Sequence, residues 1–227
     1  MGAAFEVVTF DCYGTLVDWE RGIVSAFEGV WPSAERATDS SRIVELHAEI
    51  EPQVEAERFR SYREVLDEAA VRIARRLGRE IPTGSRHFLS QSLASWPPFG
   101  DTREALTALA GAGLRLGILS NVDDDLLAAT RRQLGVEFDL LVTAEQVRSY
   151  KPAPGHFLEA RRRLGGKPWL HVAQSLFHDI APAQKLGIQA VWINRKGEPL
   201  AEGLAPLAVF PDLRSLADWL AVDAAAS

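Results

Sequence analysis

Hydrophobic and polar positions along the chain fall into two patterns. From about residue 20 to 95, apolar residues recur every three or four positions, as Ile23, Phe27 and Val30 do. This spacing is typical of amphipathic helices, and the stretch contains no run that indicates a strand. From about residue 96 onward, short and nearly continuous apolar runs alternate with helical patterns. Such runs are typical of strands in a parallel sheet that helices cover on both faces.

Five apolar runs predict the strands of this sheet. The first lies in "VVTFDCYGTLVDW", before the helical stretch, and the others follow it as "LRLGILS", "FDLLVTA", "WLHVAQS" and "AVWINR". The pattern predicts an α/β fold: a doubly wound, Rossmann-like parallel-sheet core with a helical cap inserted after the first strand. We expect the core to comprise residues 1–18 and 96–227, and the cap residues 19–95.

Composition and charge restrict the classes of partner. The chain has 227 residues and a formal net charge of −6. Nucleic acids and anionic membranes require a basic face, so neither is expected as a partner. A single cysteine, Cys12, excludes an internal disulfide, and no apolar run reaches the length of a membrane span. Because the N-terminus also lacks a signal-peptide pattern, we expect a cytoplasmic protein.

Polar residues follow four of the predicted strands. In open parallel sheets, ligands bind beyond the carboxyl ends of the strands, so these residues are expected to meet at one edge. They are Asp11, Tyr13 and Thr15 after the first strand, Ser120 and Asn121 after the second, Lys151 after the third, and Ser175, His178 and Asp179 after the fourth.

The ordered segments "DCYGTL", "LSN", "YKP" and "SLFHDIAPAQKLG" resemble motifs one to four of the haloacid dehalogenase superfamily. Within it, the details are most similar to the type II 2-haloacid dehalogenases. Phosphatases of the superfamily carry a second acid two residues after the first, and another four residues before the motif-four acid. Here these positions are Tyr13 and Ser175. A halide leaving group needs neither a proton nor a metal, so the resemblance implies a hydrolase of carbon–halide bonds without a cofactor or metal site.

The resemblance also implies a mechanism. Asp11 attacks the α-carbon of a small 2-halocarboxylate, and water then hydrolyses the ester to a 2-hydroxy acid. Lys151 keeps Asp11 ionised, and Asp179 either orients Lys151 or activates the water. Tyr13 stays among the catalytic candidates through its position, although a phenol with a pKa of ~10 suits proton transfer poorly.

Other residues are candidates for binding the substrate. Ser120 and Asn121 match the family's carboxylate binders, and Thr15 is expected to hold Asp11. The family's cap arginine, which meets the halide, aligns here with His47 in "ELHAEIEP", while Arg42, Arg58, Arg60 and Arg63 lie nearby. Gln174, Leu176 and Phe157 replace polar residues expected near motifs three and four. Ser175 and His178, beside the motif-four acid, are the last two substrate-binding candidates.

Two alternatives stay open. One is a phosphatase of a small phosphorylated metabolite, which requires Mg²⁺ in a site that lacks two of the usual acids. The other is a family member that binds a small carboxylate without turnover. The resemblance further suggests a homodimer.

Overall fold

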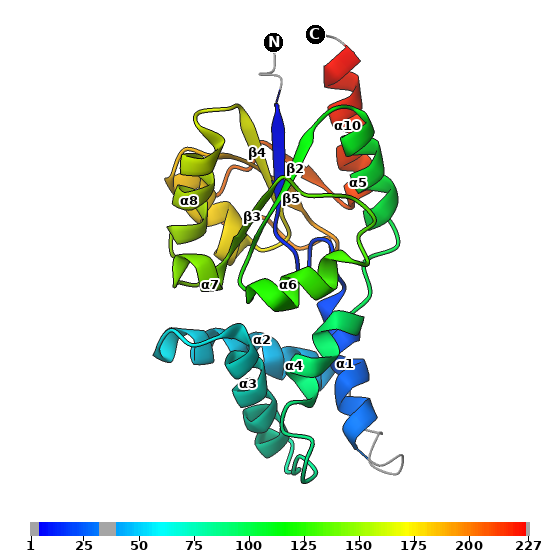
Figure 1. The fold of residues 1–227 in the computed structure, drawn as a ribbon, viewed down its shortest axis with the longest axis vertical. Helices are drawn as coiled ribbons and strands as arrows, with labels where there is room; N and C mark the ends of the chain where they lie inside the picture. Colours follow the sequence, from blue (N-terminus) through cyan, green and yellow to red (C-terminus); the bar gives the residue numbers. More distant parts are fainter. Residues whose placement is uncertain (1–4, 32–39, 226–227) are drawn as a thin grey trace.

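The structure, a computed structural model, describes residues 5–31 and 40–225. Within these residues a six-stranded parallel sheet runs in the order β3-β2-β1-β4-β5-β6, which confirms the predicted α/β fold (Figure 1). The five predicted strands are present, and a sixth at the edge was not predicted. The strands are β1 (Val7–Phe10), β2 (Arg115–Ser120), β3 (Leu140–Thr143), β4 (Trp169–Ala173), β5 (Gln189–Ile193) and β6 (Ala208–Phe210).

Helices cover both faces of the sheet, which explains the continuous apolar strands. Alternate residues of a strand face opposite sides, and in β1 Val8 and Phe10 pack into one apolar cluster while Val7 packs into another. Helices α5 (Thr102–Gly111) and α10 (Leu213–Ala225) lie on one side, and α8 (Gly155–Leu164) lies on the other (Figure 1). The central strands are therefore buried on both faces.

The order of the strands places a switch point beside β1. The chain adds β2 and then β3 on one side of β1, and β4 pairs with the opposite side. Ligand sites of open α/β sheets lie at such a point, beyond the carboxyl ends of the strands. The first residue after β1 is Asp11, whose backbone N–H donates to the carbonyl oxygen of Val172 in β4 at 3.0 Å.

In the segment predicted as a cap, the described residues form helices joined by loops, and no strand. Its helices lie beyond the carboxyl ends of the strands (Figure 1). Part of it, residues 32–39, lies outside the described residues. The helices are α1 (Trp19–Val30), α2 (Ser40–Glu57), α3 (Tyr62–Arg76) and α4 (Phe88–Ser92), followed by the 3₁₀ turn Leu93–Ser95.

Short helices complete the core. In the described ranges, no helix is long and apolar enough to cross a membrane. The remaining elements are α6 (Asp124–Arg131), α7 (Ala144–Val147), α9 (Ala181–Lys185) and a π-helical turn at Leu176–Ile180.

Candidate active site

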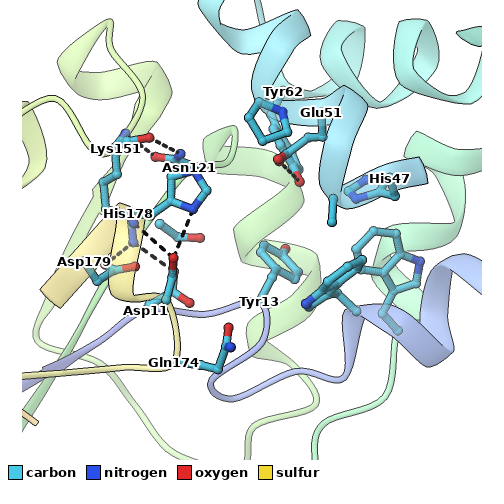
Figure 2. Close-up of a pocket in the computed structure, with 16 residues that line it drawn as sticks. Asp11, Tyr13, His47, Glu51, Tyr62, Asn121, Lys151, Gln174, His178 and Asp179 are labelled. Carbon is cyan, nitrogen blue, oxygen red and sulfur yellow. Dashed lines mark hydrogen bonds and ion pairs between the residues drawn. The ribbon is translucent and has the colours of Figure 1, made fainter. Parts of the chain in front are cut away.

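A cavity of about 180 Å³ lies between the strand ends and the helical segment. Figure 2 shows its two walls, with the strand-end residues on one side and His47, Glu51 and Tyr62 on the other. All ten candidate residues except Thr15 line it: the strand-end residues lie together at one edge of the sheet, and His47 faces them from α2. The strand-end wall includes Asp11, Ser120, Asn121, Lys151, Ser175, His178 and Asp179.

Lys151 joins two carboxylates at the base of the cavity. Its Nζ donates to Oδ1 of Asp11 at 2.9 Å and to Oδ1 of Asp179 at 2.6 Å. It donates a third hydrogen bond to the carbonyl oxygen of Leu119 at 2.9 Å. Lys151 and Asp179 are almost completely buried, and Asp11 is 8% exposed. An ammonium group has three donors, and all three are used.

These contacts set the charge of each group. Burial opposes the charge of Lys151, but Asp11 and Asp179 raise its pKa above the ordinary range. Burial also opposes ionisation of Asp179, but Lys151 and His171 hold the pKa of that carboxyl well below its usual range. For Asp11 burial is the larger effect and raises its pKa in spite of Lys151. Asp11 is therefore the more basic of the two carboxylates and the more exposed to the cavity.

The turn after β1 fixes the second oxygen of Asp11. The hydroxyl of Thr15 donates to Oδ2 at 3.0 Å and accepts the backbone N–H of Gln174 at 2.9 Å. Gly14 makes this turn with a φ of 96°, a backbone conformation that glycine adopts readily. A Cβ at Gly14 would lie 3.2 Å from the side-chain oxygen of Gln174 and 3.3 Å from Nε1 of Trp19. The sequence "YGT" thus provides both the turn and the donor that orients Asp11.

A buried pair behind Asp179 was not predicted. Nε2 of His171 lies 3.0 Å from Oδ1 of Asp179, and its Nδ1 lies 2.9 Å from the hydroxyl of Thr9. The two residues are opposite each other in the β1–β4 register. The signal in the sequence was that Thr9 and His171 are polar residues within otherwise apolar strands. As a donor to Asp179, His171 orients the carboxylate that in turn orients Lys151.

The two candidates after β2 differ in what they contact. The hydroxyl of Ser120 is buried, lines the cavity and has no hydrogen-bond partner among the described residues. Asn121 is already paired, because its Oδ1 accepts the backbone N–H of Lys151 at 2.7 Å and its Nδ2 donates to the carbonyl oxygen of Lys151 at 3.0 Å. Ser120 is therefore available to a ligand, whereas the side chain of Asn121 holds the Lys151 backbone in place.

Ser175 and His178 form a local pair after β4. The Ser175 hydroxyl accepts the backbone N–H of His178 at 3.0 Å and lies 3.2 Å from its Nδ1. Burial lowers the pKa of His178, and its Nε2 has no partner in the described part of the chain. A neutral imidazole beside Asp11 and Asp179 is suited to accept or donate one proton.

The Tyr13 side chain is poorly suited to proton transfer. Its hydroxyl lies 2.9 Å from the hydroxyl of Thr130, and its ring contacts Trp96 edge to face. Burial raises the pKa of Tyr13 well above its ordinary value. The side chain thus supplies an apolar wall to the cavity.

The helical wall carries acids instead of a cation. Glu51 lines the cavity, and its Oε1 accepts the Tyr62 hydroxyl at 3.1 Å. Nearby, Glu55 contacts Nδ2 of Asn121 at 3.4 Å. Sequence reasoning missed both glutamates, although they follow His47 at intervals of four and therefore share its helix face.

His47 is present on this wall but carries no charge. It stacks on Trp19, with 5.2 Å between the ring centroids, and burial lowers its pKa to about 3. Of the described residues that line the cavity, none is an arginine. Three of the four nearby arginines instead form ion pairs elsewhere: Arg42 with Glu45, Arg60 with Glu57, and Arg63 with Asp125.

Metal ligands are not grouped at this site. In the ranges that the structure describes, no cluster of three or more histidine, cysteine, aspartate or glutamate side chains is arranged to hold a metal ion. The two acids at the strand ends, Asp11 and Asp179, are both paired with Lys151. The donor set here is thus an ammonium between two carboxylates.

A doubly wound sheet with an Asp–Lys–Asp cluster at its switch point defines an α/β protein whose strand ends are covered by a helical segment. The model of the haloacid dehalogenase-like hydrolase family matches residues 5–187, and the chain belongs to that family. It is 28% identical over 224 residues to an (S)-2-haloacid dehalogenase of Pseudomonas putida, covering 94% of this chain and 95% of the relative.

Two further comparisons agree with this assignment. The chain is 29% identical over 201 residues to (S)-2-haloacid dehalogenase 4A of Burkholderia cepacia, covering 87% of each. The crystal structure of an L-2-haloacid dehalogenase matches with a TM-score of 0.85 and 25% identity, over 96% of this chain and 100% of that chain. The resemblance predicted from the four sequence motifs is confirmed.

Proposed function

We propose that this protein is a 2-haloacid dehalogenase that uses Asp11 as a covalent nucleophile. An oxygen of Asp11 forms a bond to the α-carbon of a small 2-halocarboxylate, and the halide leaves with the electron pair of the carbon–halogen bond. Attack from the side opposite the halide inverts the α-carbon. The observation that carries this proposal is the position of the Asp11 carboxylate, held in the cavity by Lys151 at 2.9 Å and Thr15 at 3.0 Å.

Hydrolysis completes the cycle. Water attacks Cγ of the Asp11 ester, the bond between Cγ and the oxygen now attached to the α-carbon breaks, and the 2-hydroxy acid leaves with that former Asp11 oxygen. The water loses a proton in this step, and the product alkoxide gains one. The neutral His178, whose Nε2 is unpaired among the described residues, is placed to carry that proton. The Ser120 hydroxyl, which also lacks a partner there, is placed to bind the substrate carboxylate.

Three lines of support distinguish this function from a phosphatase. The relatives reported above are named as haloacid dehalogenases. In addition, Tyr13 occupies the position that would hold a second acid. Because its pKa is raised, it is a poor proton donor to a leaving group at neutral pH. A phosphate dianion beside Asp11 would also meet repulsion that only Lys151 offsets.

Heavy-oxygen labelling tests the covalent step. Excess enzyme is mixed with 2-chloropropionate in ¹⁸O-water for a single turnover, and both products are analysed by mass spectrometry. The ester route gives unlabelled lactate and one ¹⁸O atom in the peptide that contains Asp11. Direct attack by water would label the lactate and leave the peptide unchanged, which would exclude the ester. Release of phosphate from p-nitrophenyl phosphate with Mg²⁺, without halide release, would support the phosphatase instead.

A further inference from the structure

The charges around the cavity are unbalanced. Its described lining residues include three acids, Asp11, Glu51 and Asp179, and one lysine, Lys151. Its two histidines, His47 and His178, are kept neutral because burial lowers both pKa values. With all three acids ionised, the lining therefore carries one positive and three negative charges. A substrate with only a carboxylate adds a fourth negative charge.

The excess negative charge lies on the helical wall. Lys151 already serves both strand-end acids through hydrogen bonds of 2.9 Å and 2.6 Å. Glu51 faces these groups from α2 across the cavity (Figure 2). Arg60 and Arg63, basic residues of the helical segment that do not line the cavity, are bound to Glu57 and Asp125. Among the described residues, no cation forms an ion pair with Glu51, whose hydrogen-bond donor is the Tyr62 hydroxyl.

Glu51 is built to accept a hydrogen bond from a ligand. Tyr62 donates to its Oε1 at 3.1 Å and so fixes the orientation of the carboxyl group. Its second oxygen has no donor among the described residues, and the side chain lines the cavity. A half-buried carboxylate fixed by one donor is a strong acceptor for a second, above all for a charged one.

We propose that the preferred substrate is a zwitterion, a 2-halocarboxylate whose side chain carries an ammonium group that Glu51 binds. This inference rests on the proposed dehalogenase function and names its substrate class. The carboxylate end meets Ser120, the α-carbon meets Asp11, and the ammonium end reaches the helical wall. Such a substrate has no net charge, so it enters the acidic cavity without adding to the repulsion. Glu51 is then a specificity-determining residue and takes no part in bond making or breaking.

An isosteric pair of substrates tests this directly. In 3-amino-2-chloropropionate an ammonium group replaces the terminal methyl group of 2-chlorobutyrate, and little else changes. We expect kcat/KM for chloride release at pH 8 to be about 10- to 100-fold higher for the amino compound, the effect of one charged hydrogen bond. Glu51→Gln should abolish this preference, because it keeps the shape but removes the charge. Glu45→Gln, an exposed site on the same helix that pairs with Arg42, is the matched control and should retain it.

The preference should also depend on pH. Burial raises the pKa of Glu51 to about 7, so its carboxylate is mostly ionised at pH 8 and mostly protonated at pH 6. We therefore expect the preference for the amino substrate to be larger at pH 8. The titratable groups around Glu51 are His47 and Glu55 on α2, Tyr62 on α3, Tyr150, and Asp11, Lys151, His178 and Asp179 across the cavity.

A binding measurement separates this inference from the proposed function. Calorimetry compares 3-amino-2-hydroxypropionate with 2-hydroxybutyrate, the products of the same two substrates, and requires no turnover. Tighter binding of the amino compound that is lost in Glu51→Gln supports the inference even if no halide is released. Equal or weaker binding and turnover of the amino compound, or a preference that survives Glu51→Gln, would overturn it. Halide release from 2-chlorobutyrate would then leave the dehalogenase function intact.

Discussion

The carboxylate of Asp123 accepts the backbone N–H of Tyr62 at 2.8 Å, across the boundary between the sheet side and the helical segment. It also accepts the backbone N–H of Arg63 at 2.9 Å. These two N–H groups lie at the start of α3, where the helix itself supplies no acceptor and a negative charge is favourable. Asp123 follows the substrate-binding candidates after β2, and Tyr62 orients Glu51. One carboxylate thus couples both walls of the cavity.

We predict that Asp123→Ala weakens both folding and substrate binding. Loss of a helix-capping acceptor should lower the free energy of unfolding by about 0.5–2 kcal/mol. Because Tyr62 would lose its anchor, KM should rise more than kcat falls. Urea unfolding and steady-state halide release measure the two effects. Asp125→Ala is the control: it removes only the exposed ion pair with Arg63, and such pairs contribute ~1 kcal/mol or less. Equal effects of the two variants would contradict this role for Asp123.

Lys151 should be essential for stability as well as for activity. Lys151→Met leaves two buried carboxylates without a counter-charge, and breaking a buried ion pair costs roughly 3–5 kcal/mol. Adding Asp179→Asn removes one of the two charges, so the double variant should be more stable than Lys151→Met alone. Thermal unfolding of wild type, both single variants and the double variant closes the cycle. Additive effects would mean that the contact at 2.6 Å carries no coupling.

The fold could be predicted largely because burial leaves a pattern. Strands covered on both faces need continuous apolar runs, as in residues 7–10 and 115–120. The edge strand β6 was missed because it has only three residues and is not fully buried; Val209 is 45% exposed. A short edge strand carries no such pattern, and its pairing with β5 depends on the rest of the sheet.

The candidate site was predictable where it depends on topology. Asp11, Lys151 and Asp179 follow strands, and a parallel sheet brings strand ends together whatever their separation in sequence. Glu51 was not predictable in this way, because α2 also carries exposed acids such as Glu45. Only the packing of α2 over the strand ends distinguishes a cavity acid from a solvated one. His171 was missed because it belongs to no local motif. Its partners Thr9 and Asp179 lie in a different strand and in the turn after β4, so only the folded structure brings the three together.

Asp11→Asn should abolish turnover and leave the protein at least as stable as wild type at pH 8. An amide has nearly the same shape but is not nucleophilic. Burial raises the pKa of Asp11 in the folded protein. Its protonated form therefore favours folding below the unfolded pKa, and this contribution is lost as pH rises through the folded pKa and the group ionises. A neutral amide avoids this loss. Halide release and thermal unfolding at pH 8 test both parts. Substantial activity would remove the covalent mechanism, and a large fall in melting temperature would contradict the burial argument.

The hydroxyl of Thr15 should set the pH at which activity is lost on acidification. Asp11 must be ionised to attack, and its raised pKa places the acidic limb of the kcat/KM profile above the ordinary aspartate range. Thr15 donates to Oδ2 at 3.0 Å, which favours the ionised form. Thr15→Val removes that donor, so the pKa of Asp11 should rise further. A hydrogen bond to a charged group corresponds to a shift of roughly one to two pH units.

Two further variants separate this effect from general damage. Thr15→Val also leaves the backbone N–H of Gln174 without its acceptor, which lowers stability by about 1–3 kcal/mol. Thr15→Ser retains the hydroxyl for both contacts and should restore the wild-type acidic limb. Thr107→Val, at an exposed hydroxyl bound only to the carbonyl oxygen of Arg103 in α5, should leave the limb unchanged. The profile is measured with 2-chloropropionate between pH 4 and 9. If Thr15→Val lowers the rate equally at every pH, Thr15 supports the turn without tuning the nucleophile.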